Sequence, residues 1–167
     1  LQPERMLELF HSRRIHLMNK WKGCNDYMKE NFPHQGRIPI HVFTGGETAL
    51  NEARRRQADL WQAGEPHFLC TRSMTLKPDG SPQIDDLGDS LFLRAHALLL
   101  DKTTEGIIFV LQDESVLMTG FPFDGVSSKV AADDGFLSAS GTAPLDHEVR
   151  VRIAKMVDQL PIIDGTM

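Results

Sequence analysis

The sequence contains very little cysteine. Two cysteines, Cys24 and Cys70, occur in 167 residues, which is too few for a disulfide framework and gives no metal-ligand spacing. Because free thiols persist under reducing conditions, we expect a reducing, cytoplasmic compartment, either in the protein's own cell or in a target cell after delivery. No metal motif or nucleotide fingerprint occurs elsewhere, so we predict neither a metal site nor a cofactor.

Long uncharged apolar runs are also absent. The longest are far below the roughly 18 residues that a membrane helix needs, and we expect no membrane partner. The first ten residues, LQPERMLELF, lack the basic start and the apolar core of a signal peptide. The length and composition predict a single globular domain over residues 1–167, and the missing initial Met leaves excision from a longer chain open.

Positive charge is scarce in the second part of the sequence. Residues 1–60 hold ten Lys and Arg against seven Asp and Glu, whereas residues 61–167 hold eight against sixteen, giving +3 and −8. This asymmetry excludes nonspecific binding of nucleic acid by the whole surface. Nucleic acid would have to use an N-terminal basic face, whose simpler interpretation is a solvated helix surface: Arg13, Arg14, Lys20, Lys22, Arg54, Arg55 and Arg56. We expect a protein substrate or partner instead.

The first half of the sequence predicts two helices and two β segments. Apolar residues at helical spacing indicate a helix over residues 3–22, and a second stripe, ended by Gly64 and Pro66, indicates a helix over 47–63. Residues 37–43 and 67–76 are β-like. PDGSP at 78–82 is typical of a turn.

The second half predicts a sheet followed by a helix. Three runs rich in apolar and β-branched residues, separated by short polar turns, indicate an antiparallel meander: residues 90–100, 106–112 and 115–121. Residues 122–143 are typical of loops, and residues 144–160 predict a last helix. The fold class is therefore α+β, with N-terminal helices packed on an antiparallel sheet centred on 90–121 and a C-terminal helix.

Three residues supply the side-chain types of a thiol hydrolase. Cys24 follows Gly23, and a cysteine at a helix start has a stabilised thiolate. His96 at the start of one predicted strand, and Asp113 past the end of the next, are brought level by the hairpin between them. If the helix instead runs unbroken through Gly23, Cys24 lies on a buried stripe and is an ordinary core residue.

This order of residues resembles the papain-like Cys-His-Asp proteins among secreted bacterial effectors and toxins, which include proteases and glutamine deamidases. The matching segments are Gly23-Cys24-Asn25-Asp26, His96-Ala97 and Asp113. The resemblance implies amide hydrolysis through a thioester, with Cys24 as nucleophile, His96 as base and Asp113 as the orienting group. It leaves Gln112 as an alternative orienting group and Asn19 as an oxyanion donor.

Two other functional classes remain open. A small ribonuclease-type toxin would use His96 as base and Arg94 on the same strand face for the phosphate, with Arg72 on another strand. An acidic binding module, such as an immunity or inhibitor protein, would present the aspartates of the predicted loops to a basic partner: Asp85, Asp86, Asp89, Asp124, Asp133 and Asp134.

One glycine-containing stretch adds a further possibility. TGGET, between a predicted strand and a predicted helix, can present backbone N–H groups to an anion. It matches neither a Walker loop nor a dinucleotide fingerprint, and Glu47 in the first helical turn competes for the helix dipole. A plain turn with an N-cap is the simpler interpretation.

Overall fold

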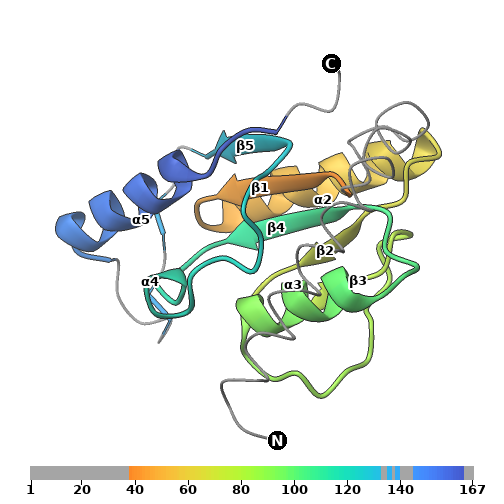
Figure 1. The fold of residues 1–167 in the computed structure, drawn as a ribbon, viewed down its shortest axis with the longest axis horizontal. Helices are drawn as coiled ribbons and strands as arrows, with labels where there is room; N and C mark the ends of the chain where they lie inside the picture. Colours follow the sequence, from red (N-terminus) through yellow and green to blue (C-terminus); the bar gives the residue numbers. More distant parts are fainter. Residues whose placement is uncertain (1–37, 133–134, 137, 140–144, 164–167) are drawn as a thin grey trace, which may run out of the picture. The chain divides into compact units, whose positions relative to one another are not determined.

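A computed structural model describes residues 38–132, 135–136, 138–139 and 145–163 of the chain. The helices and strands follow one another in the order shown in Figure 1: β1 (Ile40–Thr44), α2 (Glu47–Gln62), β2 (Phe68–Cys70), β3 (Thr75–Leu76), α3 (Leu91–Leu100), β4 (Ile107–Leu111), α4 (Val116–Thr119), β5 (Ser128–Ala131) and α5 (His147–Gln159). The helix expected over residues 3–22 lies outside the described residues.

The strands form a mixed sheet in the order β3-β2-β4-β1-β5. Strands β2, β4, β1 and β5 are parallel, and β3 pairs with β2 in the antiparallel sense. Together with the four helices of the described part, including a C-terminal one, the sheet confirms the predicted α+β class. The packing of N-terminal helices on the sheet falls outside that part.

The central strands are apolar because both of their faces are covered. All five residues of β4, IIFVL, are buried, as expected for a parallel strand between two helical layers. Alternate side chains serve opposite faces. Ile107 and Phe109 belong to one core cluster, whereas Ile108 and Val110 belong to the other.

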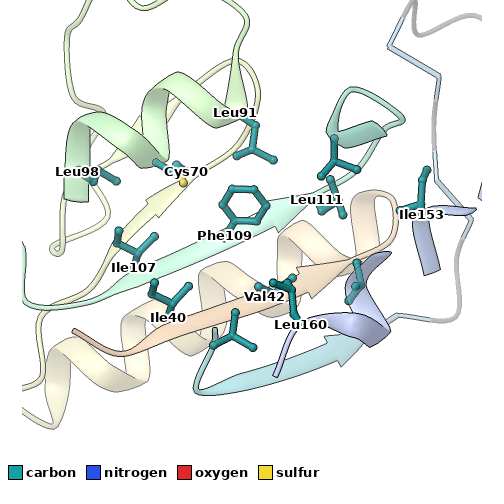
Figure 2. Close-up of a cluster of buried hydrophobic side chains, with 14 of the residues drawn as sticks. Ile40, Val42, Cys70, Leu91, Leu98, Ile107, Phe109, Leu111, Ile153 and Leu160 are labelled. Carbon is teal, nitrogen blue, oxygen red and sulfur yellow. The ribbon is translucent and has the colours of Figure 1, made fainter. Parts of the chain in front are cut away.

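The helices divide between the two faces of the sheet (Figure 1). Helix α2 contributes Ala53 and Leu60 to the cluster on one face. Helices α3 and α5 cover the other face, where Phe109 lies at the centre of the cluster in Figure 2 with Leu91 above it. Because each face carries its own cluster, the sheet is the middle layer of this part of the chain.

The predicted meander over 90–121 is wrong. Its first segment is the helix α3, whose N-cap Ser90 accepts a hydrogen bond from the N–H of Leu93 at 3.2 Å. The sequence LFLRAHALLL contains no β-branched residue and is rich in Leu and Ala, which favour helices. Its buried positions, Leu91, Arg94, Ala95 and Leu98, follow helical spacing.

The third segment of that meander is also not a strand. Residues 116–119 form the short helix α4, which Gly120 ends at φ 69°. The missing strand is β5, at residues 128–131, within the stretch expected to be a loop. It pairs with β1 in parallel, His41 with Ser128 and Thr44 with Ala131. The other predicted elements, β1, α2, the β2–β3 region, β4 and α5, are confirmed with small changes at their ends.

Candidate functional site

The carboxyl ends of β1 and β4 lie side by side, and the chain leaves them toward opposite faces of the sheet. After β1 it enters α2, on the face that holds Ala53 and Leu60. After β4 it enters α4, whose Val116 packs in the opposite cluster. In open sheets with parallel strands, such a divergence is where ligands characteristically bind. The candidate site therefore consists of the residues that follow β1, β4 and β2.

The turn after β1 consists of two buried glycines, Gly45 and Gly46. Gly45 has φ 141°, a conformation that L side chains rarely adopt, so glycine is required there. Gly46 is the N-cap of the sixteen-residue helix α2 and makes no side-chain cap hydrogen bond. The TGGET stretch is thus a turn whose N-cap offers no side-chain oxygen to the N–H groups of the first helical turn.

The loop after β4 fixes this glycine turn in place. The N–H of Gly45 donates to the carbonyl of Leu111 at 3.1 Å. The side-chain amide of Gln112 donates from Nε2 to the carbonyl of Gly46 at 3.0 Å. Gln112, considered above as an orienting group for a histidine, therefore orients the backbone that begins α2.

An ion pair joins the ends of β2 and β4. Arg72 Nε lies 3.3 Å from Asp113 Oδ2, and the side chains are 33% and 9% exposed, respectively. The other carboxylate oxygen, Oδ1, accepts a hydrogen bond from the N–H of Ser115 at 2.9 Å. Asp113 is therefore held by an arginine and a backbone amide, and it in turn orients the partly exposed guanidinium of Arg72.

The backbone of Arg72 is held from two sides. Thr71 makes a tight turn, in which its hydroxyl oxygen accepts hydrogen bonds from the N–H groups of Ser73 and Met74 at 3.3 and 3.2 Å. From α3, Arg94 Nε donates to the carbonyl of Arg72 at 3.2 Å. These contacts place the Arg72 side chain at the carboxyl ends of the parallel strands, which we call the carboxyl edge. Within the described residues, its terminal nitrogens make no hydrogen bond.

His96 lies on the exposed side of α3 and not on a strand. Its ring stacks against Phe92 with centroids 6.0 Å apart. Within the described residues, no hydrogen bond joins His96 to Asp113, whose carboxylate is bound by Arg72 and Ser115. The predicted hairpin, which would place His96 and Asp113 next to each other, does not form, because its first strand is instead the helix α3.

Arg94 and His96 do not share a face, contrary to the expectation for a ribonuclease. Two residues apart on a helix, they point about 200° apart. Arg94 is 5% exposed, and its side chain donates to protein groups on α3's inner side: Arg72, Thr75, Asp85 and Gly88. Arg94 is therefore engaged in holding the fold together and is not available to a phosphate.

Of the proposed thiol site, Cys24 and Asn19 lie outside the described residues. Cys70, at the end of β2, is fully buried. Burial raises the pKa of its thiol to about 12, against the opposing effect of the Arg94 charge. A thiol with that pKa is protonated at neutral pH and is not a nucleophile.

The structure describes only part of the charged surfaces that the sequence predicts. Arg54, Arg55 and Arg56 are exposed on α2, whereas the other four basic residues of that face lie outside the described part. Among the loop aspartates, Asp86, Asp89 and Asp124 are exposed, but Asp85 is paired with Arg94. Asp85 is therefore not available to a partner, and Asp133 and Asp134 lie outside the described residues.

Membrane-spanning helices and metal-binding clusters are both absent from the described residues. No helix there combines the length and the apolar character that a membrane crossing requires. In the same part of the chain, no three His, Cys, Asp or Glu side chains gather in a group suited to a metal ion.

Comparison with known proteins adds no family. No protein-family model matches the sequence, and no curated protein is significantly similar to it. The function is therefore inferred from the geometry of the carboxyl edge alone. In the sequence, only the TGGET stretch indicates a ligand site in this region. No sequence pattern predicts that Arg72 pairs with Asp113.

Proposed function

We propose that this domain binds a small molecule carrying a phosphate group at the carboxyl edge of the sheet. The phosphate lies at the Gly45–Gly46 turn, and the guanidinium of Arg72 contacts the phosphate or the group next to it. The observation that carries the proposal is the Arg72–Asp113 ion pair, at the edge where the connections leaving β1 and β4 diverge.

Three features of this edge favour an anion. The first turn of α2 presents N–H groups and the positive end of the helix dipole. Its N-cap is a glycine without a capping side chain, so a ligand oxygen meets no competing hydroxyl or carboxylate from that residue. Arg72, which is paired with Asp113 through Nε, contributes a planar donor group whose remaining N–H groups suit phosphate oxygens.

The spacing of the strands sets the size of the ligand. Strand β4 lies between β1 and β2, so the glycine turn and the end of β2 are two strand spacings, about 10 Å, apart. Arginine can reach across much of this distance. A ligand that fills the edge therefore has a phosphate and at least one further polar group, as a sugar phosphate, a pyrophosphate or a nucleotide does.

Isothermal titration calorimetry at low ionic strength tests the proposal. The full chain is titrated with inorganic phosphate, pyrophosphate, and nucleoside mono-, di- and triphosphates. We expect at least one phosphate compound to bind, and Arg72→Gln to weaken its binding by about 10- to 100-fold, the loss of one hydrogen bond to a charged group. Arg56→Gln, an exposed arginine on α2, is the matched control and should change the affinity less than twofold.

Gln112→Leu provides a second arm. It removes the hydrogen bond that holds the Gly46 carbonyl while leaving every ligand-facing charge in place, and we expect a loss of affinity smaller than that of Arg72→Gln. The proposal is wrong if no phosphate compound binds at millimolar concentration. It is equally wrong if Arg72→Gln binds as tightly as the unaltered protein.

A further inference from the structure

Thr44, the last residue of β1, carries a nearly buried hydroxyl next to the glycine turn. The residue is 7% exposed, and within the described residues its Oγ1 makes no hydrogen bond. A buried hydroxyl without a partner has lost the hydrogen bonds that water would give it, and this loss costs free energy in the folded protein. Since buried polar groups are normally hydrogen-bonded, Thr44 has the character of a residue that contacts a ligand.

The side chain of Thr44 faces the side of the sheet on which α3 and α5 pack. Side chains along a strand alternate between the two faces. Val42 belongs to the cluster under α3 and α5, whereas Phe43 belongs to the cluster under α2. Thr44 therefore points to the same side as Val42, away from α2.

The Arg72–Asp113 ion pair also lies next to this face. Arg94 of α3 donates to the carbonyl of Arg72. Thr44 is in register with Leu111 of the neighbouring strand β4, and Asp113 follows Leu111 by two residues. Strands β1 and β4 are one strand spacing, about 5 Å, apart. A ligand that extends from the glycine turn to the ion pair therefore passes close to the hydroxyl of Thr44.

The charges at the carboxyl edge favour one phosphate over two. Arg72 is already paired with Asp113. The next carboxylate, that of Glu114, accepts a hydrogen bond from the N–H of Ala139 at 3.2 and 3.0 Å to its two oxygens. A second phosphate beside the ion pair would meet the negative charges of Asp113 and Glu114. An uncharged polar group avoids this repulsion and still finds donors and acceptors there.

We propose that the ligand of this site is a sugar phosphate whose hydroxyl groups bind Thr44 and the Arg72–Asp113 pair. This inference rests on the proposed function, in which the phosphate itself binds at the Gly45–Gly46 turn. A hydroxyl both donates and accepts hydrogen bonds, so it suits the hydroxyl of Thr44, the N–H groups of Arg72 and the oxygens of Asp113. The site thus selects a phosphate monoester with neighbouring hydroxyls over pyrophosphate.

Calorimetric titration of the full chain with matched phosphate compounds tests this selectivity. Ribose 5-phosphate and glucose 6-phosphate carry hydroxyls, methyl phosphate supplies the phosphate alone, and pyrophosphate supplies a second phosphate. We expect the better of the two sugar phosphates to bind about tenfold more tightly than methyl phosphate or pyrophosphate, because it makes additional hydrogen bonds. If methyl phosphate or pyrophosphate binds as tightly, the inference is wrong and the phosphate site stands. If no phosphate compound binds, both are wrong.

Thr44→Val tests the role of the hydroxyl, because valine keeps the shape of threonine. We expect it to weaken binding of the sugar phosphate about tenfold and binding of methyl phosphate less than about twofold. Thr44→Ser keeps a hydroxyl and should retain most of the affinity. Thr103→Val is the matched control. It removes an exposed threonine hydroxyl in the loop before β4 and should leave both affinities unchanged.

The melting temperature without ligand separates ligand binding from a structural role. Thr44→Val should not lower it, since no hydrogen bond of the described protein is lost. A lower melting temperature with an unchanged affinity for the sugar phosphate would make Thr44 a structural residue and overturn the inference. Equal losses of affinity for the sugar phosphate and methyl phosphate would also overturn it, because Thr44 would then contact the phosphate and not the sugar.

Discussion

Arg94 and Asp85 form a buried ion pair in which Arg94 Nη1 lies 2.8 Å from both carboxylate oxygens. Their side chains are 6% and 12% exposed. The same guanidinium donates to the hydroxyl of Thr75 at 3.1 Å and to the carbonyl of Gly88 at 2.8 Å. Through these contacts, Arg94 ties the loop before α3 to β3 and, by its bond to the Arg72 carbonyl, to the candidate site.

Breaking this pair from one side should be costly. Arg94→Met leaves the Asp85 carboxylate without its cation, and we expect the free energy of unfolding to fall by about 3–5 kcal/mol. Urea unfolding followed by circular dichroism measures the change. Arg94→Met combined with Asp85→Leu should lose less than the two single changes added together, because no charge is then stranded. Arg55→Met, at an exposed position, should stay within about 0.5 kcal/mol. A similar loss from Arg55→Met would contradict this account.

Gly106 is required by a close approach to a histidine ring. A Cβ at this position would lie 2.4 Å from Cδ2 of His67, whose ring is buried at the start of β2. We therefore expect Gly106→Ala to destabilise the fold by about 1–3 kcal/mol through overpacking. Gly135→Ala is the comparison, because among the described residues its Cβ would meet only Arg150 Nη1, at an ordinary 3.5 Å. Thermal unfolding of the two variants should separate them clearly; equal melting temperatures would refute the steric argument.

The sequence predicts strands and helices well where both their pattern and their composition agree. β4 is a continuous run of Ile, Phe, Val and Leu, and α2 has one apolar stripe that ends at glycine. The prediction of a strand over residues 90–100 is wrong because apolar residues occupy both sides of this helix, which obscures the helical period in the sequence. Ser90 as N-cap and the absence of β-branched residues were the signals that favoured a helix.

The candidate site was only partly accessible from the sequence. The sequence predicts the TGGET turn and a role for Asp113, but it gives His96 and not Arg72 as the partner of Asp113. Arg72 and Asp113 are far apart in the sequence and meet because β2 and β4 are parallel neighbours. That pairing follows from the α3 crossover. A strand in place of α3 removes this crossover, so the predicted meander gives a wrong strand order and wrong neighbours for Asp113.

Lys129 should stabilise the end of α5. From the edge strand β5, its ammonium donates to three carbonyl oxygens at the helix C-terminus, those of Val157, Asp158 and Leu160, at 3.3, 3.3 and 2.9 Å. A cation there also complements the helix dipole. We expect Lys129→Met to cost about 1–3 kcal/mol of unfolding free energy, whereas Lys129→Arg should retain much of it. Urea unfolding measures both; equal losses from Met and Arg would show that charge at this helix end is unimportant.

The buried thiol of Cys70 should make stability fall at high pH. Its folded pKa of about 12 lies above the ordinary value of a free thiol, so the thiol ionises first in the unfolded state. The contribution of the Cys70 thiol to the free energy of unfolding is fully present below pH 9. It is lost as the pH rises toward 12, at up to about 1 kcal/mol per pH unit. Between pH 8 and 11, the free energy of unfolding should fall less steeply with pH for Cys70→Ala than for the unaltered protein. If the two slopes are the same, the thiol ionises in the folded protein.

Alkylation of the two cysteines tests the thiol-hydrolase hypothesis. Iodoacetamide should leave Cys70 unmodified in the folded protein near neutral pH, because its thiol is buried and protonated. A nucleophilic Cys24 paired with His96 would react rapidly already at pH 6 and more slowly in His96→Ala. The thiol-hydrolase hypothesis is wrong if Cys24 reacts at pH 6 no faster than an ordinary thiol, or if His96→Ala leaves its rate unchanged.

The most direct test of the proposed ligand site is to locate where a phosphate compound binds. Proton–nitrogen correlation spectra of the labelled protein, recorded during a titration with pyrophosphate, report on each backbone amide. The account predicts that the largest shifts occur at Gly45, Gly46 and the first turn of α2, with Arg72 affected as well. Shifts confined to the exposed Arg54–Arg56 surface of α2, or no saturable shift at all, would contradict it.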